Sequence, residues 1–322
     1  MPYLSEIAAL LTALCWLCSS MAFAVASREA GADATNLFRL YAALLPLAVL
    51  GWLTTGSCWP TEGDPGAVTW LAVSGLVGLT IGDLALFHAL GTIGPRLGSV
   101  IMALWPGMTV GIDALRGAVP STPELVGIAL TVGGVMLVLR RSREGSWRPE
   151  LPPRQWTIGI VCAFVGALGQ AAGFVIASDA MQPVVGMAAA GDAMQPGVEG
   201  GAAIPPLLAT IVRMVAATIG MQLVAALRGK ALVMKAVLQN RRAHVAAWLG
   251  ATFGPVLGVW LSMVAAKDVA SRGVASALMS TTPVFMLPIA VRFYGARVGP
   301  LAVLGTLLAV AGVAVCFVFA DA

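Results

Sequence analysis

Charged side chains are few in the apolar stretches of this sequence, and three of them are Arg39, Asp83 and Arg213. A charge inside such a stretch is costly to bury, so each is a candidate for binding or coupling. A carboxylate such as Asp83 could take up a proton or an amine group in one state and release it in another. The structural alternative is that Arg39 and Asp83 form a buried ion pair that pins two helices together. Arg213 has no acid at the matching place.

Other chemistry has little support in the sequence. The chain has two histidines, and its five cysteines lie mostly in apolar runs, where thiols stay protonated and inert. We therefore expect no metal and no cofactor. An enzyme would need clustered carboxylates or His and Cys ligands, so we expect no enzyme. ATP as the driving force is also disfavoured, because no Gly-rich stretch leads into Lys-Ser or Lys-Thr.

The elements that must position these charges are membrane helices. Only 11% of the 322 residues are charged and the mean hydropathy is +0.90, which is too apolar for a soluble globular protein. The net charge of +4 is assigned to membrane loops, so the expected partners are the lipid bilayer and a small-molecule substrate, with no nucleic acid. Ten apolar runs are long enough to cross a bilayer as helices. They are 7–27, 36–55, 68–90, 97–115, 123–139, 156–178, 204–227, 245–266, 273–291 and 300–319.

The two halves of the chain repeat each other in order. "FAVAS" at 23–27 matches "FVIAS" at 174–178 at an offset of 151, whereas later matches, such as "RLYAA" with "RMVAA", run at offsets of 174 to 178. The offset therefore jumps once, between the sixth and seventh runs, where "DAMQP" occurs twice, at Asp179 and Asp192. We interpret 179–203 as a loop inserted into the second copy. A lid or a partner-binding loop is the functional alternative.

The domain organisation follows from this repeat. The first repeat covers 1–142, a basic central loop covers 143–155, and the second repeat covers 156–322. A five-helix unit crosses the membrane an odd number of times, so its second copy must run in the opposite sense. The predicted fold is an all-α integral membrane protein with ten transmembrane helices arranged as two inverted five-helix repeats. This architecture is typical of secondary transporters, with the substrate site between the halves.

The sequence resembles the EamA-type transporters of the drug/metabolite transporter superfamily. The resemblance rests on Arg39 in "LFRLYAALLPLAVL", on "GLTIGDLALFHALGTIGPRLGSVIMALWPGMTVGIDAL" and "GIALTVGGVMLVL", and on Arg213 and "SRGVASALMSTTPVFMLPIAV" in the second half. Two departures are visible: only Glu124 could stand in for the family's Gly-Glu pairs, and the loop before the third run lacks Lys and Arg. The resemblance implies a central cavity lined by Trp16, Ser19, Trp105, Gln170 and Trp260.

Two prolines occupy equivalent places in the fourth and ninth runs. Pro106 and Pro283 each free the carbonyl four residues earlier, and Thr281 with Thr282 could satisfy part of that gap. Such breaks can expose backbone to a ligand or let a helix bend. A static kink that packing compensates is the equally weighted alternative.

Charge counting and family resemblance give opposite orientations. The odd-numbered loops hold 14 Lys and Arg residues and the even-numbered loops hold three, which predicts that both termini lie outside the cytoplasm. The resemblance implies that both lie inside. We follow the charge count, because it comes from this chain.

The predicted function is a secondary transporter of the cell membrane with several crossings. We expect it to export small metabolites such as amino acids or amphipathic compounds by alternating access, driven by a gradient of protons or of the substrate. A channel or passive facilitator is the alternative, and an integral membrane enzyme is less favoured. A second copy of the chain is a further candidate partner, as a homodimer.

Overall fold

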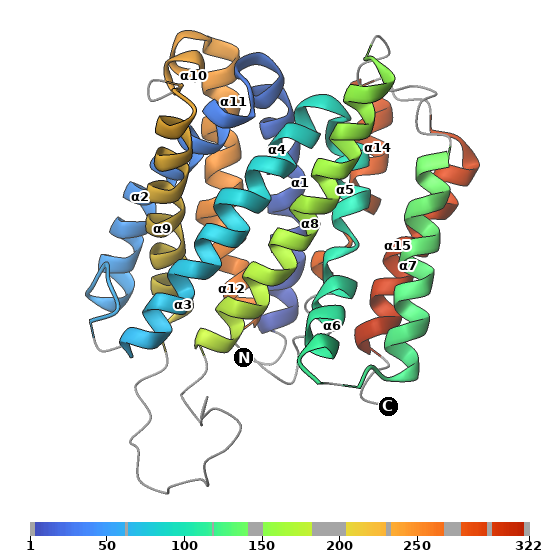
Figure 1. The fold of residues 1–322 in the computed structure, drawn as a ribbon, viewed down its shortest axis with the longest axis horizontal. Helices are drawn as coiled ribbons and strands as arrows, with labels where there is room; N and C mark the ends of the chain where they lie inside the picture. Colours follow the sequence, from blue (N-terminus) through green and yellow to red (C-terminus); the bar gives the residue numbers. More distant parts are fainter. Residues whose placement is uncertain are drawn as a thin grey trace, which may run out of the picture.

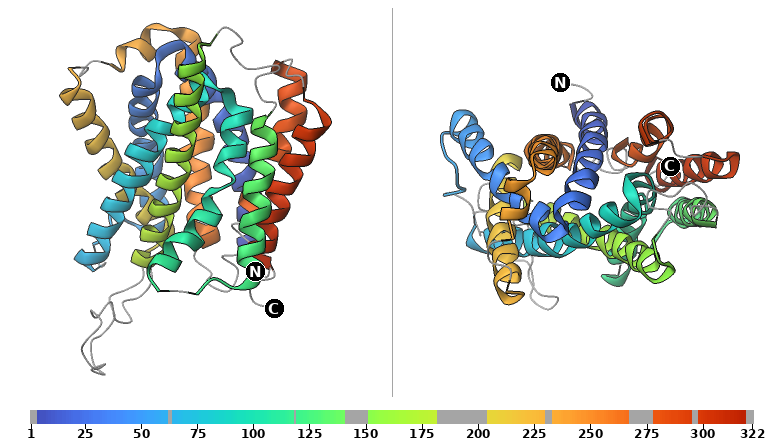
Figure 2. Two further views of the ribbon diagram at one scale, coloured as in Figure 1. Left: turned by 45° about the vertical axis from the view of Figure 1, so that its right-hand side comes forward. Right: turned by 90° about the horizontal axis from the view of Figure 1, so that it is seen from above.

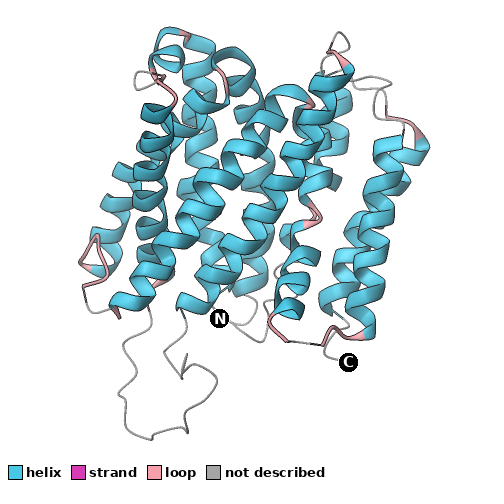
Figure 3. Cartoon of the chain, in the orientation of Figure 1, coloured by secondary structure: helices cyan, strands magenta, loops and turns pink. Residues whose placement is uncertain are grey.

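The computed structural model describes residues 4–61, 64–117, 119–140, 151–181, 204–229, 233–266, 278–294 and 298–318. Within these residues every regular element is a helix and none is a strand (Figure 3). Eight helical stretches are long and apolar enough to cross a membrane by length and composition. The apolar part of the last helix, Pro300–Val315, is shorter. A membrane protein made of helices is therefore supported, whereas the count of ten crossings stays a prediction.

Most of the predicted runs are helices that extend slightly beyond the predicted ends. Uninterrupted helices are α1 (Leu4–Ala30), α2 (Ala32–Thr55), α7 (Thr122–Arg140), α8 (Pro153–Met181), α9 (Pro206–Leu227) and α15 (Pro300–Val318). A short helix, α10 (Lys235–Gln239), precedes the eighth run. The extra residues are the capping and interfacial turns, which carry too many polar groups to count as apolar runs.

The third and eighth runs each contain a π-helical segment, which the sequence analysis did not predict. The third consists of α3 (Pro65–Gly75), η1 (Leu76–Gly82) and α4 (Asp83–Thr92). The eighth consists of α11 (Arg241–Ala251), η2 (Thr252–Val259) and α12 (Trp260–Ala266). The two π segments begin 176 residues apart, and both helices start at a capping side chain, Asp64 or Asn240, which are also 176 residues apart. π segments leave wider turns and are frequent at functional sites.

The fourth and ninth runs are broken just before their prolines, which corrects the prediction that each is one continuous helix. In the fourth run α5 (Gly94–Met102) ends, residues 103 and 104 form a turn, and α6 (Trp105–Leu115) begins. In the ninth run residues 280 and 281 form the turn before α14 (Thr282–Tyr294). Pro106 and Pro283 are thus the second residue of a new helix. The first turn tolerates proline because its N–H groups have no intrahelical acceptor.

The helices form one bundle in which the two halves interleave (Figure 1). Helix α1 packs along α11 and η2 of the second half, while α8 packs along η1 and α4 of the first half. Helices α7 and α15 form a close pair at one edge (Figure 2), where a Cβ on Gly134 would lie 2.4 Å from the carbonyl oxygen of Gly305. The start of α1 and the end of α15 lie at the same end of the bundle (Figure 1).

Helix α8 ends later than predicted. The predicted helix stops at residue 178 and the predicted insertion starts at 179, but α8 continues to Met181. Asp179 forms an ion pair with Arg116, at the end of α6, with 2.8 Å between Oδ2 and Nη1. Residues 182–203 of the predicted insertion and 143–150 of the basic central loop lie outside the described residues.

Candidate functional site

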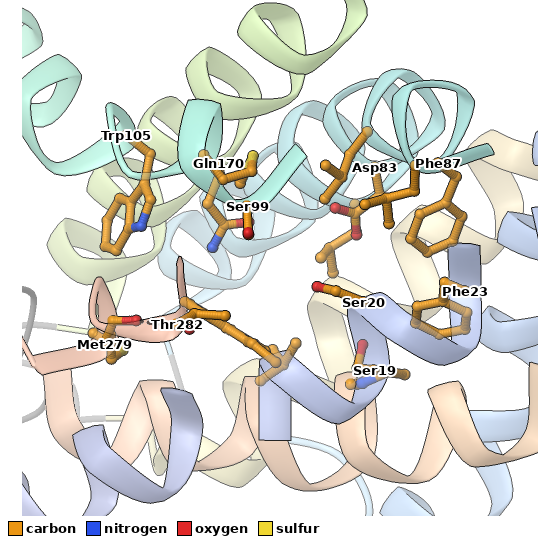
Figure 4. A pocket seen from close by; sticks show the side chains of 18 of the residues that line it. Ser19, Ser20, Phe23, Asp83, Phe87, Ser99, Trp105, Gln170, Met279 and Thr282 are labelled. Carbon is orange, nitrogen blue, oxygen red and sulfur yellow. Dashed lines mark hydrogen bonds between the residues drawn. The ribbon is translucent and has the colours of Figure 1, made fainter. Parts of the chain in front are cut away.

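A cavity lies at the centre of the bundle between helices of both halves. It encloses about 830 Å³ of empty space, including the part that opens to solvent, and α1, α2, η1, α4, α5, α6, α8, η2 and α14 contribute to its wall. Figure 4 shows Asp83, Phe87 and Phe23 towards one end, Trp105 and Met279 at the other, and Ser20, Ser99, Gln170 and Thr282 between them. The cavity therefore has a charged end, an apolar end and a polar middle.

The charged end is built on an ion pair between α2 and α4. The Arg39 Nη2 donates a hydrogen bond to Asp83 Oδ2, and the two side chains are only 3% and 13% exposed. The Arg39 guanidinium also lies 5.0 Å from the ring centroid of Phe87, within range of a cation–π interaction. The structure thus brings together the two charges that the sequence analysis considered as a pair.

Segment η1 supplies a backbone acceptor to this ion pair. The Leu79 carbonyl oxygen accepts a hydrogen bond from Arg39 Nη2 at 3.1 Å and one from Asn36 Nδ2 at 3.4 Å. A regular α-helix uses its carbonyls for its own bonds, whereas a π segment rearranges them. The π segment therefore presents polar backbone atoms to Arg39 within an apolar helix.

Asn36 is a site residue that the sequence analysis missed. It is fully buried, and its Oδ1 accepts a hydrogen bond of 2.9 Å from Arg39 Nε. Asn36 precedes Arg39 by three residues, so both side chains lie on one face of α2. An uncharged amide one turn before an intramembrane arginine was the signal that could have identified it. By holding Nε, Asn36 orients the guanidinium towards Asp83.

Arg213 lies behind the cavity wall, so its predicted place at the substrate site is not what the structure shows. It is 2% exposed, its Nη1 lies 3.6 Å from the Met263 sulfur, and its Nε has no hydrogen-bond partner. Two glycines make room for it: a Cβ on Gly75 would lie 2.3 Å from the Arg213 carbonyl oxygen, and one on Gly78 would lie 3.5 Å from Nη2. The guanidinium therefore sits against η1, on which Arg39 also depends.

Aromatic rings form much of the apolar wall. The rings of Phe23 and Phe87 are 4.6 Å apart, and those of Trp105 and Phe174 are 5.1 Å apart in an edge-to-face arrangement. Helix α1 can pack closely against segment η2, because side chains at the η2 glycine positions would collide with α1. A Cβ on Gly254 would lie 2.8 Å from Ser19 Oγ. Helix α1 therefore approaches η2 closely at this glycine.

The remaining predicted residues divide into two groups. Trp16, Ser19, Trp105, Gln170 and Pro283 line the cavity together with Arg39 and Asp83. Trp260 and Thr281 are not part of its wall, which corrects their predicted placement, and Pro106, predicted as a hinge, does not line it either.

The corrections have local causes. Trp260 starts α12 and packs against the core. Thr281 donates to the Leu278 carbonyl at 2.7 Å, because it lies in the turn where the helix is broken. Thr282 faces the cavity instead and donates to the Met279 carbonyl at 3.1 Å. That bond satisfies the carbonyl that Pro283 leaves free, as the sequence analysis anticipated for this threonine pair.

The described part of the chain contains no cluster of side chains that could bind a metal ion. No group of three or more His, Cys, Asp or Glu residues gathers there at a spacing that could hold a metal ion. The polar side-chain groups of the cavity wall are hydroxyls, two indole N–H groups, one amide, one carboxylate and one guanidinium. Such a set can bind an organic molecule by hydrogen bonds and charge, with apolar walls for its body.

Comparisons with known proteins identify a similar fold and a family. None of the curated proteins matches the chain. Among 21 matching chains of solved structures, one described only as a crystal structure of a protein covers 98% of this chain and 97% of its own, with 17% identity and a TM-score of 0.66. That likeness shows the fold alone. The profile of the EamA-like transporter family matches residues 4–140 and 197–318, which is more than half of the sequence. The chain is a multi-pass membrane protein and belongs to the EamA-like transporter family.

Proposed function

We propose that the protein is a secondary transporter that exports a small amphipathic molecule by alternating access through the central cavity. The observation that carries this proposal is the cavity itself, because elements of both halves line it and the ion pair of Arg39 and Asp83 forms its charged end. A site between two halves can open to either side when one half rocks against the other. The cell membrane is the expected location.

Two features of the backbone support inverted repeats and ten crossings. The π segments η1 and η2 begin 176 residues apart, and the turns that break the fourth and ninth helices are 177 residues apart. The packing is reciprocal as well, since α1 lies along α11 and η2 while its counterpart α8 lies along α4 and η1. A duplicated five-helix unit that crosses in opposite senses accounts for both observations.

Asp83 is the proposed coupling residue. Among the described residues, Asp83 provides the carboxylate of the cavity wall. Its ion pair with Arg39 can form or break as α2 and α4 move. A proton taken up by Asp83 would release Arg39, and release of the proton would restore the pair. The breaks before Trp105 and Thr282 are the proposed hinges, because the helix ladder is already interrupted there.

Counterflow in proteoliposomes tests the proposal. A ligand is first identified by thermal-shift screening of the purified protein against amino acids and amphipathic compounds. We expect labelled ligand to enter vesicles faster when they are preloaded with unlabelled ligand, and the rate to saturate. Ser99→Trp should stop this uptake by filling the cavity, whereas Thr69→Trp, at an exposed position on α3, should not. Uptake that rises linearly without counterflow would indicate a channel and overturn the proposal.

A further inference from the structure

The buried charges at the centre of the bundle do not balance. Among the described residues the buried charged side chains are Arg39, Arg96 and Arg213, and Asp83 is the carboxylate that lies among them. Arginine stays protonated in proteins, so the group of Arg39, Asp83 and Arg213 carries an excess positive charge. Arg96, near the start of α5, has the same sign. An unbalanced charge in a low-dielectric interior is costly until an opposite charge joins it.

Arg213 is the source of this imbalance. No carboxylate forms an ion pair with it among the described residues, and its Nε has no hydrogen-bond partner. It interacts electrostatically with Asp83, which is already paired with Arg39. The Arg213 charge therefore acts on the charged end of the cavity through η1 without touching a ligand there.

Arg39 offers the contact that an anion would need. Its Nε and Nη2 are used by Asn36, Leu79 and Asp83. Its Nη1 makes no hydrogen bond to the described residues, and the Arg39 side chain forms part of the cavity wall. Nη1 is therefore the Arg39 nitrogen that remains for a ligand in the cavity. A carboxylate could accept a hydrogen bond from Nη1 and a further one from a neighbouring serine hydroxyl.

We propose that the substrate is an amphipathic anion, with a carboxylate or similar group at the Arg39 end and an aromatic or aliphatic body against Trp105 and Met279 at the other end of the cavity (Figure 4). This inference rests on the proposed function and names the substrate class of the same cavity. A cationic ligand would instead have to displace Arg39 from Asp83 and would add to the excess charge.

Binding of three matched probes tests the charge preference. We use 3-phenylpropanoate, 3-phenylpropanamide and 3-phenylpropylamine, which share one body and carry a negative, neutral or positive group at pH 7. Dissociation constants are measured by titration calorimetry on the purified protein in detergent. We expect the acid to bind at least about tenfold more tightly than the amide, and the amine to bind more weakly than the amide. Equal binding, a preference for the amine, or no binding of the acid would overturn the inference.

Charge variants test the origin of the preference. Arg213→Gln removes the excess charge and should bring the acid and amide to similar affinities, while Arg213→Lys should keep the preference. Asp83→Asn adds to the excess and should increase the preference. Arg228→Gln is the matched control, because it makes the same change near the end of α9 at an exposed residue that pairs with Asp33. If Asp83→Asn lowers the preference, the charge account is wrong even when Arg213→Gln does not fold.

The outcomes separate this inference from the proposed function. If the acid is preferred in binding but shows no counterflow, the anion site stands and transport is refuted. If the amine shows saturable counterflow and the acid does not, transport stands and the anion inference is refuted.

Discussion

Arg39 and Arg213 occupy equivalent places in the two halves, but their surroundings differ. Arg39 has a carboxylate, an amide, a backbone carbonyl and an aromatic ring around its guanidinium. Arg213 has a methionine sulfur and an Nε without a partner. The repeated backbone thus places a buried arginine twice, while only one half supplies its counterion. The difference gives the cavity its polarity, because a symmetric pair of ion pairs would leave no excess charge.

The glycines of the two π segments differ in the same way. In η1, Gly82 faces the α8 backbone, since a Cβ on it would lie 3.1 Å from the Cα of Gly169, and Gly78 lies against the α8 backbone and the Arg213 guanidinium. Those of η2 face the cavity-lining side chains of α1, such as Ser19 and Phe23. The η1 glycines therefore allow close packing of helices around Arg213. The η2 glycines instead make room for the α1 side chains that line the cavity.

Replacing Asp83 should have the largest effect on function. We expect Asp83→Asn to abolish accumulation driven by an imposed gradient in proteoliposomes, while binding and exchange of the ligand continue. The reason is that an amide keeps the shape of the side chain but cannot take up or release a proton. If Asp83 only pins helices, the variant should fold less well and the surviving molecules should still accumulate ligand. That result would remove the coupling role.

Removing Arg39 should have the largest effect on stability. Arg39→Leu leaves Asp83 buried without its partner, which costs about 3–5 kcal/mol for a buried pair. Arg213→Leu should cost less, because no ion pair is lost. Thermal unfolding of both variants in the same detergent measures the contrast. Adding Asp83→Asn to Arg39→Leu should recover part of the loss, and equal destabilisation by the two leucine variants would contradict the comparison.

Alanine at one glycine of each π-containing helix should separate the two surfaces. Gly75→Ala places a Cβ 2.3 Å from the Arg213 backbone, which must shift, so we expect a loss of about 1–3 kcal/mol. Gly254→Ala meets the flexible end of Ser19 first and should cost less. Gly111→Ala, where nothing lies within 4 Å of the new Cβ, is the control for the substitution itself. A larger loss at Gly254 than at Gly75 would reverse the assignment.

Shortening the tandem phrase should have the smallest effect. Deleting 179–191 joins Ser178 to Asp192, and the following residues again read "DAMQP", so an aspartate returns to the position that pairs with Arg116. We expect unchanged folding and transport. Asp192→Ala within this deletion should cost no more than about 0–1 kcal/mol, because the ion pair is exposed. Loss of the folded protein on deletion would show that the phrase is required.

The sequence was sufficient for the membrane class and for the positions of most helices, because long apolar runs have one stable solution in lipid. It also identified the pairing of Arg39 with Asp83, since charges in such runs are few. The ordered repeat pointed to the family, which the match over both halves supports. Polar neutral residues carried less signal, which is why Asn36 was missed.

The interruptions of the helices were harder to predict. Segment η1 contains glycines but no proline, and it packs against α8 and α9, which lie far from it in the sequence. Trp105 and Thr282, the first residues after the two breaks, are each followed directly by a proline. The sequence therefore indicated where the helices are disturbed, but not that a turn would divide each of them into two. Trp260 was misplaced because a π segment just before it changes which face of the helix its side chain occupies.

Accessibility of the cavity from both sides of the membrane is the most direct test of alternating access. Ser20 lines the cavity and can be replaced by cysteine in a chain without the native cysteines. A membrane-impermeant maleimide, applied to one side of the membrane at a time, should label Ser20→Cys from either side, and bound ligand should slow both reactions. Exposed Cys58, kept alone in the loop after α2, should react from one side only. Labelling of Ser20→Cys from a single side, under all gradients, would contradict the account.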